Sequence, residues 1–257
     1  MDFFSHDRRS VIHPREMVTA FAQRKGLKSD DLALESLALI TFTLPDLKRL
    51  TEIDRRATEI EAWRTRNLRV FRGDGWIAAR SPYGAPNAVM LLEEFIAFGV
   101  KRVIYLGYCG SLQEGIPVGD VVIPTEAIRE EGTSYHYLPE GEKSLPDRFV
   151  QDRLFDWVSE TSSAPHKGKV WTTDAPYREA PKKIVQYREE GVLAVEMEMS
   201  AVFAVAEVRR ISVGSILLVS DEVRETEWKI GFFSSTLKET RERAIEGLLV
   251  HLKEMIP

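Results

Sequence analysis

The sequence predicts a single α/β domain in which helices flank a central mixed β-sheet. First, short apolar runs alternate along the chain with longer amphipathic segments, a pattern typical of α/β proteins. Second, the runs at 76–80 and 102–106 enclose a helical pattern at 86–98, as in a βαβ unit. Third, no internal repeat or low-complexity linker divides the 257 residues, which are enough to bury one large core.

Local signals place the elements in chain order. A helix is expected to start after Pro14, because proline suits the first turn of a helix. The expected strands lie at residues 37–42, 76–80, 102–106, 119–124, 170–173, 191–195 and 215–220. The expected helices lie at residues 11–23, 86–98, 147–160, 181–190, 199–206 and 234–255. Residues 107–110 are expected to form a tight turn, and 129–137 and 159–165 to form loops.

Composition and charge exclude several classes of function. A formal net charge of -5 gives no overall attraction for nucleic acid or for an anionic membrane. The longest apolar stretches are far shorter than the ~20 residues of a membrane helix, and no signal-peptide pattern is present, so a cytoplasmic protein is expected. With Cys109 as the single cysteine and five scattered histidines, we expect neither an internal disulfide nor a metal site.

Three acidic residues and one methionine at the ends of two predicted strands form the strongest candidate site. Glu196, Met197 and Glu198 lie where a strand gives way to a helix, and Asp221 directly follows another strand. Ligands of open α/β sheets bind beyond the carboxyl ends of the strands, so these side chains are expected to face one crevice. An acid that stabilises the start of a helix would explain Glu198 alone. It would not explain the pairing with Asp221.

Three further segments carry weaker signals, each with a structural alternative. Glycines in 107–110 could expose backbone N–H groups to an anion, or simply form a turn. Residues 84–87, with Arg80 upstream, could bind a phosphate or a carboxylate, or merely start a helix. The aromatic segment 129–137 is interpreted as a wall of the site, with a subunit contact as the alternative.

Four segments, in this order, resemble the nucleoside phosphorylase-I superfamily, which includes purine nucleoside phosphorylases, uridine phosphorylases and nucleosidases. They are residues 106–111 (LGYCGS), 118–124 (VGDVVIP), 195–198 (VEME) and 219–221 (VSD). The similarity spans about residues 35 to 250, and residues 127–134 and 168–173 also resemble AMP nucleosidase. It implies a nucleoside phosphorylase-like α/β domain at 35–257, preceded at 1–34 by a helical extension that is a candidate for a subunit interface.

The resemblance implies a role for each of the acidic segments. Glu198 would accept hydrogen bonds from the ribose 2′- and 3′-hydroxyls, Met197 would pack on the sugar, and Glu196 would border the sugar or the base. Asp221 would donate a proton to the departing purine, since breaking the N-glycosidic bond leaves negative charge on the base. His13 would reach the ribose across a subunit interface. Its alternative is a residue at a helix start.

The base and phosphate contacts are less well defined. Candidates for base binding are Tyr177, Arg178 and Val195. Phosphorylases of the family bind phosphate with arginines and a hydroxyl, but here Tyr105 and Tyr108 occupy two of those positions. Loss of a bidentate arginine leaves hydrolysis open. The remaining candidates for binding phosphate or another anion are Gly107, Tyr108, Arg49, Arg56 and Arg80.

We therefore expect an enzyme of purine salvage that cleaves a nucleoside by phosphorolysis, giving free base and ribose 1-phosphate. A purine nucleoside is favoured, inorganic phosphate is the expected co-substrate, and no cofactor is expected. A homo-oligomer is expected, with a dimer as its unit and a hexamer as one option. Two alternatives stay open, a hydrolytic nucleosidase acting on a nucleoside or AMP, and a nucleoside-binding relative without catalysis.

Overall fold

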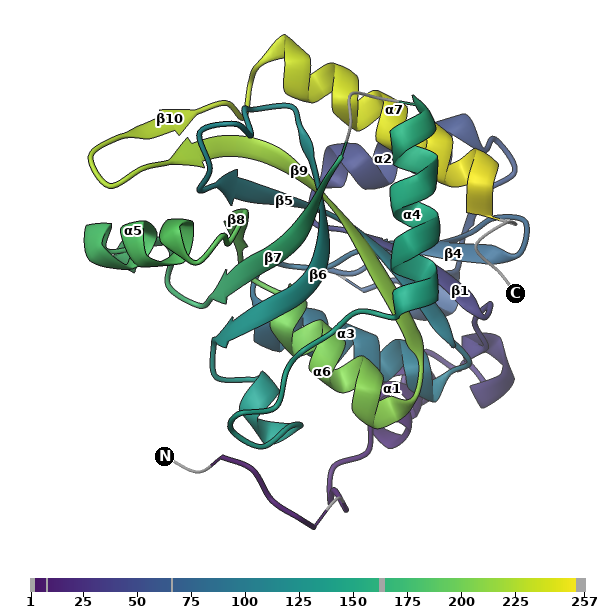
Figure 1. Ribbon diagram of the computed structural model, residues 1–257. Helices are drawn as coiled ribbons and strands as arrows, with labels where there is room; N and C mark the ends of the chain where they lie inside the picture. Colours follow the sequence, from purple (N-terminus) through teal and green to yellow (C-terminus); the bar gives the residue numbers. More distant parts are fainter. Residues whose placement is uncertain (1–2, 8, 66, 162–164, 253–257) are drawn as a thin grey trace.

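The computed structural model describes residues 3–7, 9–65, 67–161 and 165–252, and within them it confirms the predicted α/β class (Figure 1). One mixed sheet of ten strands is flanked by seven α-helices in these ranges. The strands are β1 (Leu37–Thr41), β2 (Thr58–Glu59), β3 (Val70–Arg72), β4 (Trp76–Arg80), β5 (Arg102–Ser111), β6 (Val121–Glu130), β7 (His166–Thr173), β8 (Ala194–Glu196), β9 (Ser212–Val223) and β10 (Trp228–Ile230). The α-helices are α1 (Pro14–Gln23), α2 (Leu44–Ile53), α3 (Ala85–Ala97), α4 (Arg148–Thr161), α5 (Pro181–Glu189), α6 (Met199–Arg209) and α7 (Ser235–His251).

The strand β5 connects the two parts of the sheet. The strand order is β10-β9-β6-β7-β8-β5-β1-β4-β3-β2, and an additional pairing of β9 with β5 closes five of these strands into a ring. At one position of β5, Gly110 pairs with Val195 of β8 and with Asp221 of β9. The topology therefore brings together the two segments of the sequence that carry the candidate acids.

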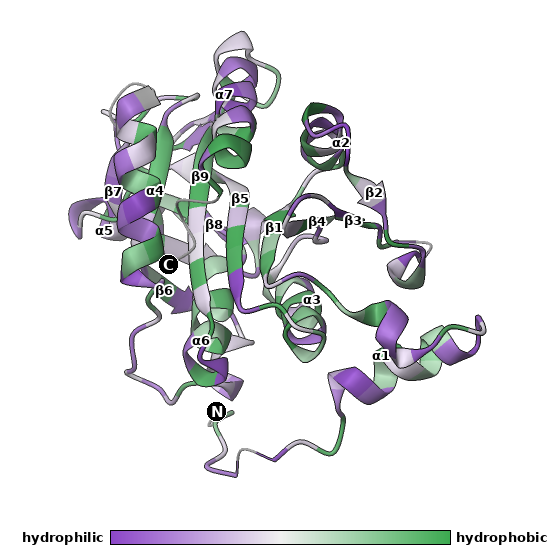
Figure 2. Ribbon diagram, turned by 90° about the vertical axis from the view of Figure 1, so that its right-hand side faces the viewer, coloured by the Kyte–Doolittle hydropathy of each residue, from purple (hydrophilic) through white to green (hydrophobic). Residues whose placement is uncertain are grey.

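Two layers of helices cover the sheet. Helices α1, α3 and α6 lie on one face and α2, α4 and α7 on the other, while β5 and β9 run between the layers and are largely hydrophobic (Figures 1 and 2). The helices are apolar where they meet the sheet, as Phe95 of α3, Phe203 of α6 and Leu248 of α7 illustrate, each at most 1% exposed. Among the described residues, no helix is both long and apolar enough to cross a membrane.

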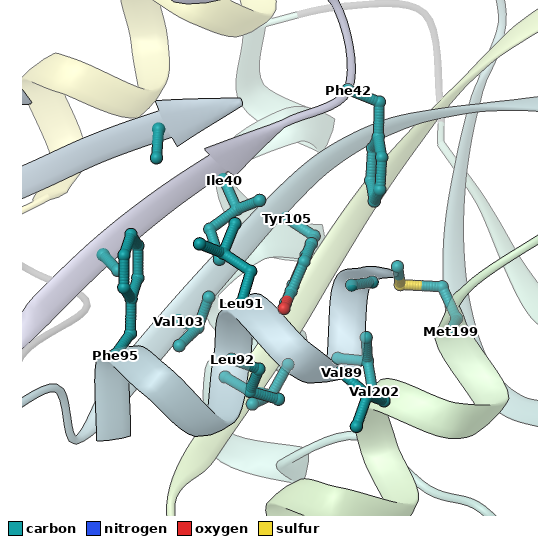
Figure 3. Packing of buried hydrophobic residues seen from close by; sticks show 14 of the residues in the cluster. Ile40, Phe42, Val89, Leu91, Leu92, Phe95, Val103, Tyr105, Met199 and Val202 are labelled. Atoms are coloured by element: carbon teal, nitrogen blue, oxygen red, sulfur yellow. The ribbon is translucent and has the colours of Figure 1, made fainter. Parts of the chain in front are cut away.

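Tyr105 of β5 lies in the core under α3. Figure 3 shows its ring among Ile40, Leu91 and Val202, and it stacks on Phe42 with ring centroids 5.9 Å apart. The hydroxyl group is buried and has no hydrogen-bond partner among the described residues. Burial raises the pKa of this phenol far above its ordinary value, so Tyr105 is a neutral core residue. The position where phosphorylases of the resembled family have an arginine is thus closed to an anion here.

Most predicted elements are confirmed to within a few residues, but the predicted turn at 107–110 is wrong. These residues continue β5 to Ser111, with a shift of register between Cys109 and Gly110. The glycines are needed for packing and not for a turn, because a Cβ atom would lie 3.0 Å from Leu217 at Gly107 and 2.7 Å from Val223 at Gly110.

Other differences concern segments whose local pattern is weak. Helix α2 was not predicted because its sequence is mostly polar, although Pro45 lies in its first turn and the Thr43 hydroxyl accepts a hydrogen bond from the N–H group of Asp46. The short strands β2, β3 and β10 were also not predicted. Strand β6 runs on to Glu130, into the expected loop. Parts of the predicted loop at 159–165 and of the predicted helix at 234–255 lie outside the described residues.

Candidate active site

A cavity of about 1250 Å³ opens at the end of the sheet where β5, β8 and β9 meet. This is larger than the ~300–1,000 Å³ of most small-molecule sites. Strand β8, the hairpin of β9 and β10, and helix α5 lie at this end of the molecule (Figure 1). Glu196, Met197, Glu198 and Asp221 all line the cavity, so the structure brings the predicted acidic segments together in one space.

Glu198 is held at the start of α6. It occupies the position before the first helical residue, and its Oε1 atom accepts a hydrogen bond of 2.7 Å from the backbone N–H of Gly84. Gly84 has a φ of 93° and begins α3, so two helix starts meet at this carboxyl group. Glu198 is only 5% exposed, and burial together with the charge of Glu196 raises the pKa of its carboxyl group well above the ordinary value.

Glu196 also lines the cavity, but its carboxylate is used by the protein itself. Its Oε2 atom accepts hydrogen bonds from the backbone N–H groups of Glu198 and Met199, at 2.6 and 2.8 Å, and its Oε1 atom accepts one from the Thr172 hydroxyl. These bonds satisfy donors at the start of α6 that a helix leaves free. Glu196 therefore positions Glu198, and a contact of Glu196 with ribose stays a prediction.

Asp221 is bound at both of its carboxylate oxygens. The hydroxyl of Ser220 donates to Oδ1 at 2.7 Å, and the indole Nε1–H of Trp228 donates to Oδ2 at 2.8 Å. Trp228 belongs to β10, which pairs with the end of β9. Gly110 leaves room for the group, since a Cβ atom there would lie 3.0 Å from Oδ2. The carboxyl group is thus fixed at the cavity wall and 8% exposed.

A second polar cluster lies at the other side of the cavity and centres on Asp46 of α2. This residue is fully buried, and its carboxylate accepts hydrogen bonds from the Thr43 hydroxyl at 2.6 Å and from the Tyr108 hydroxyl at 2.9 and 3.0 Å. Arg241 of α7 lies 3.7 Å from the same carboxylate. Burial raises the pKa of Asp46, while the hydrogen bonds and Arg241 partly oppose this shift. Thr43, Tyr108 and Arg241 line the cavity.

The predicted base-binding residues lie at the cavity only in part. Val195 and Tyr177 line it, although Tyr177 is 96% exposed, and Arg178 does not line it. Glu179 was not predicted, yet it lines the cavity, and burial with the charge of Asp221 raises the pKa of its carboxyl group to about 7. Trp228, also unpredicted, contributes its indole ring beside Asp221.

Four of the five predicted anion ligands do not line the cavity of their own chain. Arg49 forms ion pairs with Glu242 and Glu246 of α7, and Arg56 is 75% exposed beside Asp54. Gly107 packs between Leu217 and Phe42, and Arg80 ends β4 outside the lining. Only Tyr108 lies where it was expected. The cations at the cavity are instead Arg224, Lys238 and Arg241.

One further predicted site residue and one predicted wall segment lie away from this cavity. His13 precedes α1, is exposed and makes no capping hydrogen bond. The segment 129–137 does not line the cavity, so its interpretation as a site wall is wrong for the described chain. Arg129 explains its shape, because the guanidinium donates to the backbone carbonyls of Leu138, Pro139 and Glu142 and stacks on Tyr135.

Comparison with known proteins identifies the family. The profile described as "Phosphorylase superfamily" matches residues 36–254. The chain belongs to this superfamily. Its phosphorylases use phosphate as co-substrate without a cofactor. Within the described ranges, no group of three or more His, Cys, Asp or Glu residues is arranged to hold a metal ion.

Curated relatives and solved structures agree with this assignment. The chain is similar to a guanosine phosphorylase of Halorubrum lacusprofundi, with 33% identity over 136 residues, 53% of this chain and 56% of that protein. It is also similar to a DeoD-type purine nucleoside phosphorylase of Bacillus cereus, with 30% identity over 142 residues, 54% of this chain and 60% of that protein. The matched regions thus span somewhat more than half of these relatives.

Similar solved structures show the fold. Purine nucleoside phosphorylase from Toxoplasma gondii has a TM-score of 0.77 at 23% identity, over 85% of this chain and 90% of that one. AMP nucleosidase from Bacteroides thetaiotaomicron has a TM-score of 0.72 at 24% identity, over 94% and 98% of the two chains. The superfamily member described here therefore shares its fold with both phosphorolytic and hydrolytic proteins.

Proposed function

We propose that this superfamily member cleaves the N-glycosidic bond of purine nucleosides and transfers the ribosyl group to phosphate. The observation that carries the proposal is that Glu198 and Asp221 line one cavity, each held by hydrogen bonds from its own neighbours. The two ends of a nucleoside differ in their chemical needs. The ribose hydroxyls donate hydrogen bonds to an acceptor, and the leaving base takes up a proton. Two carboxyl groups that line one cavity can meet both needs.

In this proposal Glu198 binds the ribose and Asp221 assists the base. The N–H of Gly84 fixes the Glu198 carboxylate, which in its ionised form accepts hydrogen bonds from the two adjacent ribose hydroxyls. Asp221 donates a proton to the purine as the N-glycosidic bond breaks. The electron pair of that bond leaves with the base, and a phosphate oxygen forms the new bond at the anomeric carbon. The products are free base and ribose 1-phosphate.

The direct test measures base release from inosine, guanosine, adenosine and uridine, with and without phosphate, and with AMP in parallel. We expect phosphate-dependent release from at least one purine nucleoside and much slower release from uridine. Ribose 1-phosphate should appear in equal amount to the base. Turnover unchanged by omission of phosphate would reject phosphorolysis, and no base release from any of the five compounds would reject the catalytic proposal.

Hydrolysis is the second candidate, and a specific observation favours it. Tyr105 is buried in the core where an arginine would be expected, and the Tyr108 hydroxyl is bound to the buried Asp46. The oxygen of Tyr108 can still accept a hydrogen bond from a water molecule, which would take the place of phosphate. Free ribose or ribose 5-phosphate as the sugar product, with no requirement for phosphate, would identify this reaction.

We further propose that the active unit is a homo-oligomer in which a second copy contributes His13. The residue is exposed at the start of α1 and does not line the cavity of its own chain. A dimer or larger assembly in solution, together with a higher KM for nucleoside in His13→Ala, is expected. A fully active monomer would contradict this proposal.

A further inference from the structure

Two cations on one side of α7 face the cavity beside the Asp46 cluster. Lys238 and Arg241 are three residues apart in the helix, and both line the cavity together with Thr43 and Tyr108. Residues three apart in a helix are neighbours on its surface. No pattern in the sequence distinguishes these two residues, because α7 has the pattern of an ordinary amphipathic helix.

Neither cation has all of its hydrogen-bond donors paired within the described chain. The ammonium group of Lys238 makes no hydrogen bond or ion pair with any described residue. Arg241 donates from Nη2 to Glu242 at 3.2 Å, but its buried Nε–H group has no hydrogen-bond partner in the described chain. Arg49, on the neighbouring helix α2, differs because Glu242 and Glu246 both bind its guanidinium. The free ammonium group of Lys238 and the guanidinium of Arg241, whose Nε atom lies 3.7 Å from the Asp46 carboxylate, therefore lie at the same cavity.

The acids near Lys238 and Arg241 each have other partners in the protein. Asp46 lies 3.7 Å from Arg241, but its carboxylate already accepts from Thr43 and Tyr108, and burial raises its pKa. Glu242 is shared between Arg49 and Arg241. The phenol of Tyr108 is kept neutral, because burial and the charge of Asp46 raise its pKa far above the ordinary value. Lys238 and Arg241 therefore offer hydrogen-bond donors to an anion in this corner of the cavity.

We propose that Lys238 and Arg241 form a phosphoryl-binding subsite of this cavity, with the hydroxyls of Thr43 and Tyr108 beside it. A guanidinium and an ammonium are the groups that proteins use most to bind phosphate, one as a planar fork and the other as a point charge. This inference rests on the proposed function, because it supplies the phosphate contacts that Tyr105 and Tyr108 do not. The ligand is inorganic phosphate or the 5′-phosphate of a purine nucleoside monophosphate.

The test measures ligand binding by calorimetry on the full chain, with inorganic phosphate, AMP and adenosine as probes. Lys238→Met keeps the aliphatic part of the side chain and removes the charge. Arg241→Lys keeps the charge near Asp46 and removes the fork. Lys48→Met is the matched control, because Lys48 is 77% exposed on α2 and does not line the cavity. Thermal unfolding checks that each variant is folded, and the exposed Lys238 carries the test should Arg241→Lys fail to fold.

We expect both α7 variants to weaken binding of the phosphoryl ligand at least tenfold, with Lys48→Met unchanged. If inorganic phosphate is the ligand, its KM rises in the variants while the KM for nucleoside stays within about twofold. If the 5′-phosphate is the ligand, AMP binds the wild type more tightly than adenosine and loses this advantage in the variants. Unchanged binding of phosphate and AMP in both variants, or an equal loss in Lys48→Met, would overturn the subsite.

Binding and turnover separate the two proposals. A wild-type protein that binds phosphate through Lys238 and Arg241 but releases no base keeps the subsite and rejects the enzymatic function. A wild-type protein that releases base while both variants keep the phosphate KM and the AMP affinity of the wild type rejects the subsite and keeps the function.

Discussion

The two sides of the cavity are built differently. On one side, Glu198 lies just after β8 and Asp221 lies near the end of β9. Glu196 and Ser220 of the same segments hold them in place, together with Gly84 and Trp228. On the other side, Thr43, Tyr108 and Arg241 come from three separate elements and meet around the buried Asp46. The first side repeats the motif of the superfamily, and the second departs from it. In the proposed function, the first is the retained side, where ribose and base bind, and the second is the rebuilt side, where the attacking group binds.

The largest effect is expected at Asp221, on the retained side. Asp221→Asn cannot donate the proton that the leaving base needs, so kcat/KM for a purine nucleoside should fall ~10²–10⁴-fold. Steady-state kinetics with inosine measure this loss. A nitrophenyl riboside serves as the control substrate because its leaving group needs no proton, and the variant should cleave it at a nearly normal rate. An equal loss with both substrates would show that Asp221 acts by positioning or folding.

A smaller loss is expected for the ribose contact. Glu198→Gln replaces charge-assisted hydrogen bonds to the sugar with neutral ones, so kcat/KM should fall about 10- to 100-fold. The ratio of activity on a ribonucleoside to activity on its 2′-deoxy analogue should also fall towards one. Competition assays with the paired substrates measure the ratio. A ratio like that of the wild type would contradict the assignment of Glu198 to the ribose hydroxyls.

Removing the hydroxyl of either tyrosine of β5 tests the rebuilt side through the free energy of unfolding. Tyr108→Phe removes a donor from the buried carboxylate of Asp46 and should lower the free energy of unfolding by about 1–3 kcal/mol. Tyr105→Phe removes a buried hydroxyl without a partner and should be neutral or stabilising. Urea denaturation of both variants gives the two values. A large loss for Tyr105→Phe would mean that its hydroxyl has a partner in solution, and the rebuilt side would need another explanation.

The smallest effect concerns the pH dependence of stability. Burial and Glu196 raise the pKa of Glu198 in the folded state, so its ionisation opposes folding. Below the pKa of the unfolded chain, near 4.5, the carboxyl group is protonated in both states and costs no stability. Stability is lost as the pH rises from that value through the higher pKa of the folded state. Glu198→Gln should therefore stabilise the protein at pH 8 by on the order of 1 kcal/mol, and much less at pH 5. Denaturation at the two pH values measures the difference, and a stabilisation that does not grow with pH would contradict it.

The sequence pattern predicts that the acidic residues of the retained side lie together, because its signals are local, but Glu179 and Trp228 were missed. Glu196, Met197 and Glu198 are contiguous, and Asp221 follows an apolar run that predicts a strand, so the pairing of β5 with β8 and β9 brings them together. The rebuilt side has no such signal. Arg241 and Asp46 are nearly two hundred residues apart, and their contact depends on the packing of α7 against α2. The prediction of a turn at 107–110 was wrong for a related reason. In the sequence, glycines that permit close packing of strands cannot be told apart from glycines that form turns.

The ring formed by β5, β9, β6, β7 and β8 also bears on how copies of this chain can associate. Strand β5 is paired on both edges over most of its length, with β9 on one edge and with β1 and β8 on the other, so it offers few backbone groups to another molecule. The sheet ends in β10 and β2, which have three and two residues, and such short edges are poor templates for intermolecular pairing. Among the described strands, these two short edges are therefore unfavourable sites for the association of copies of the chain and for fibrous aggregation.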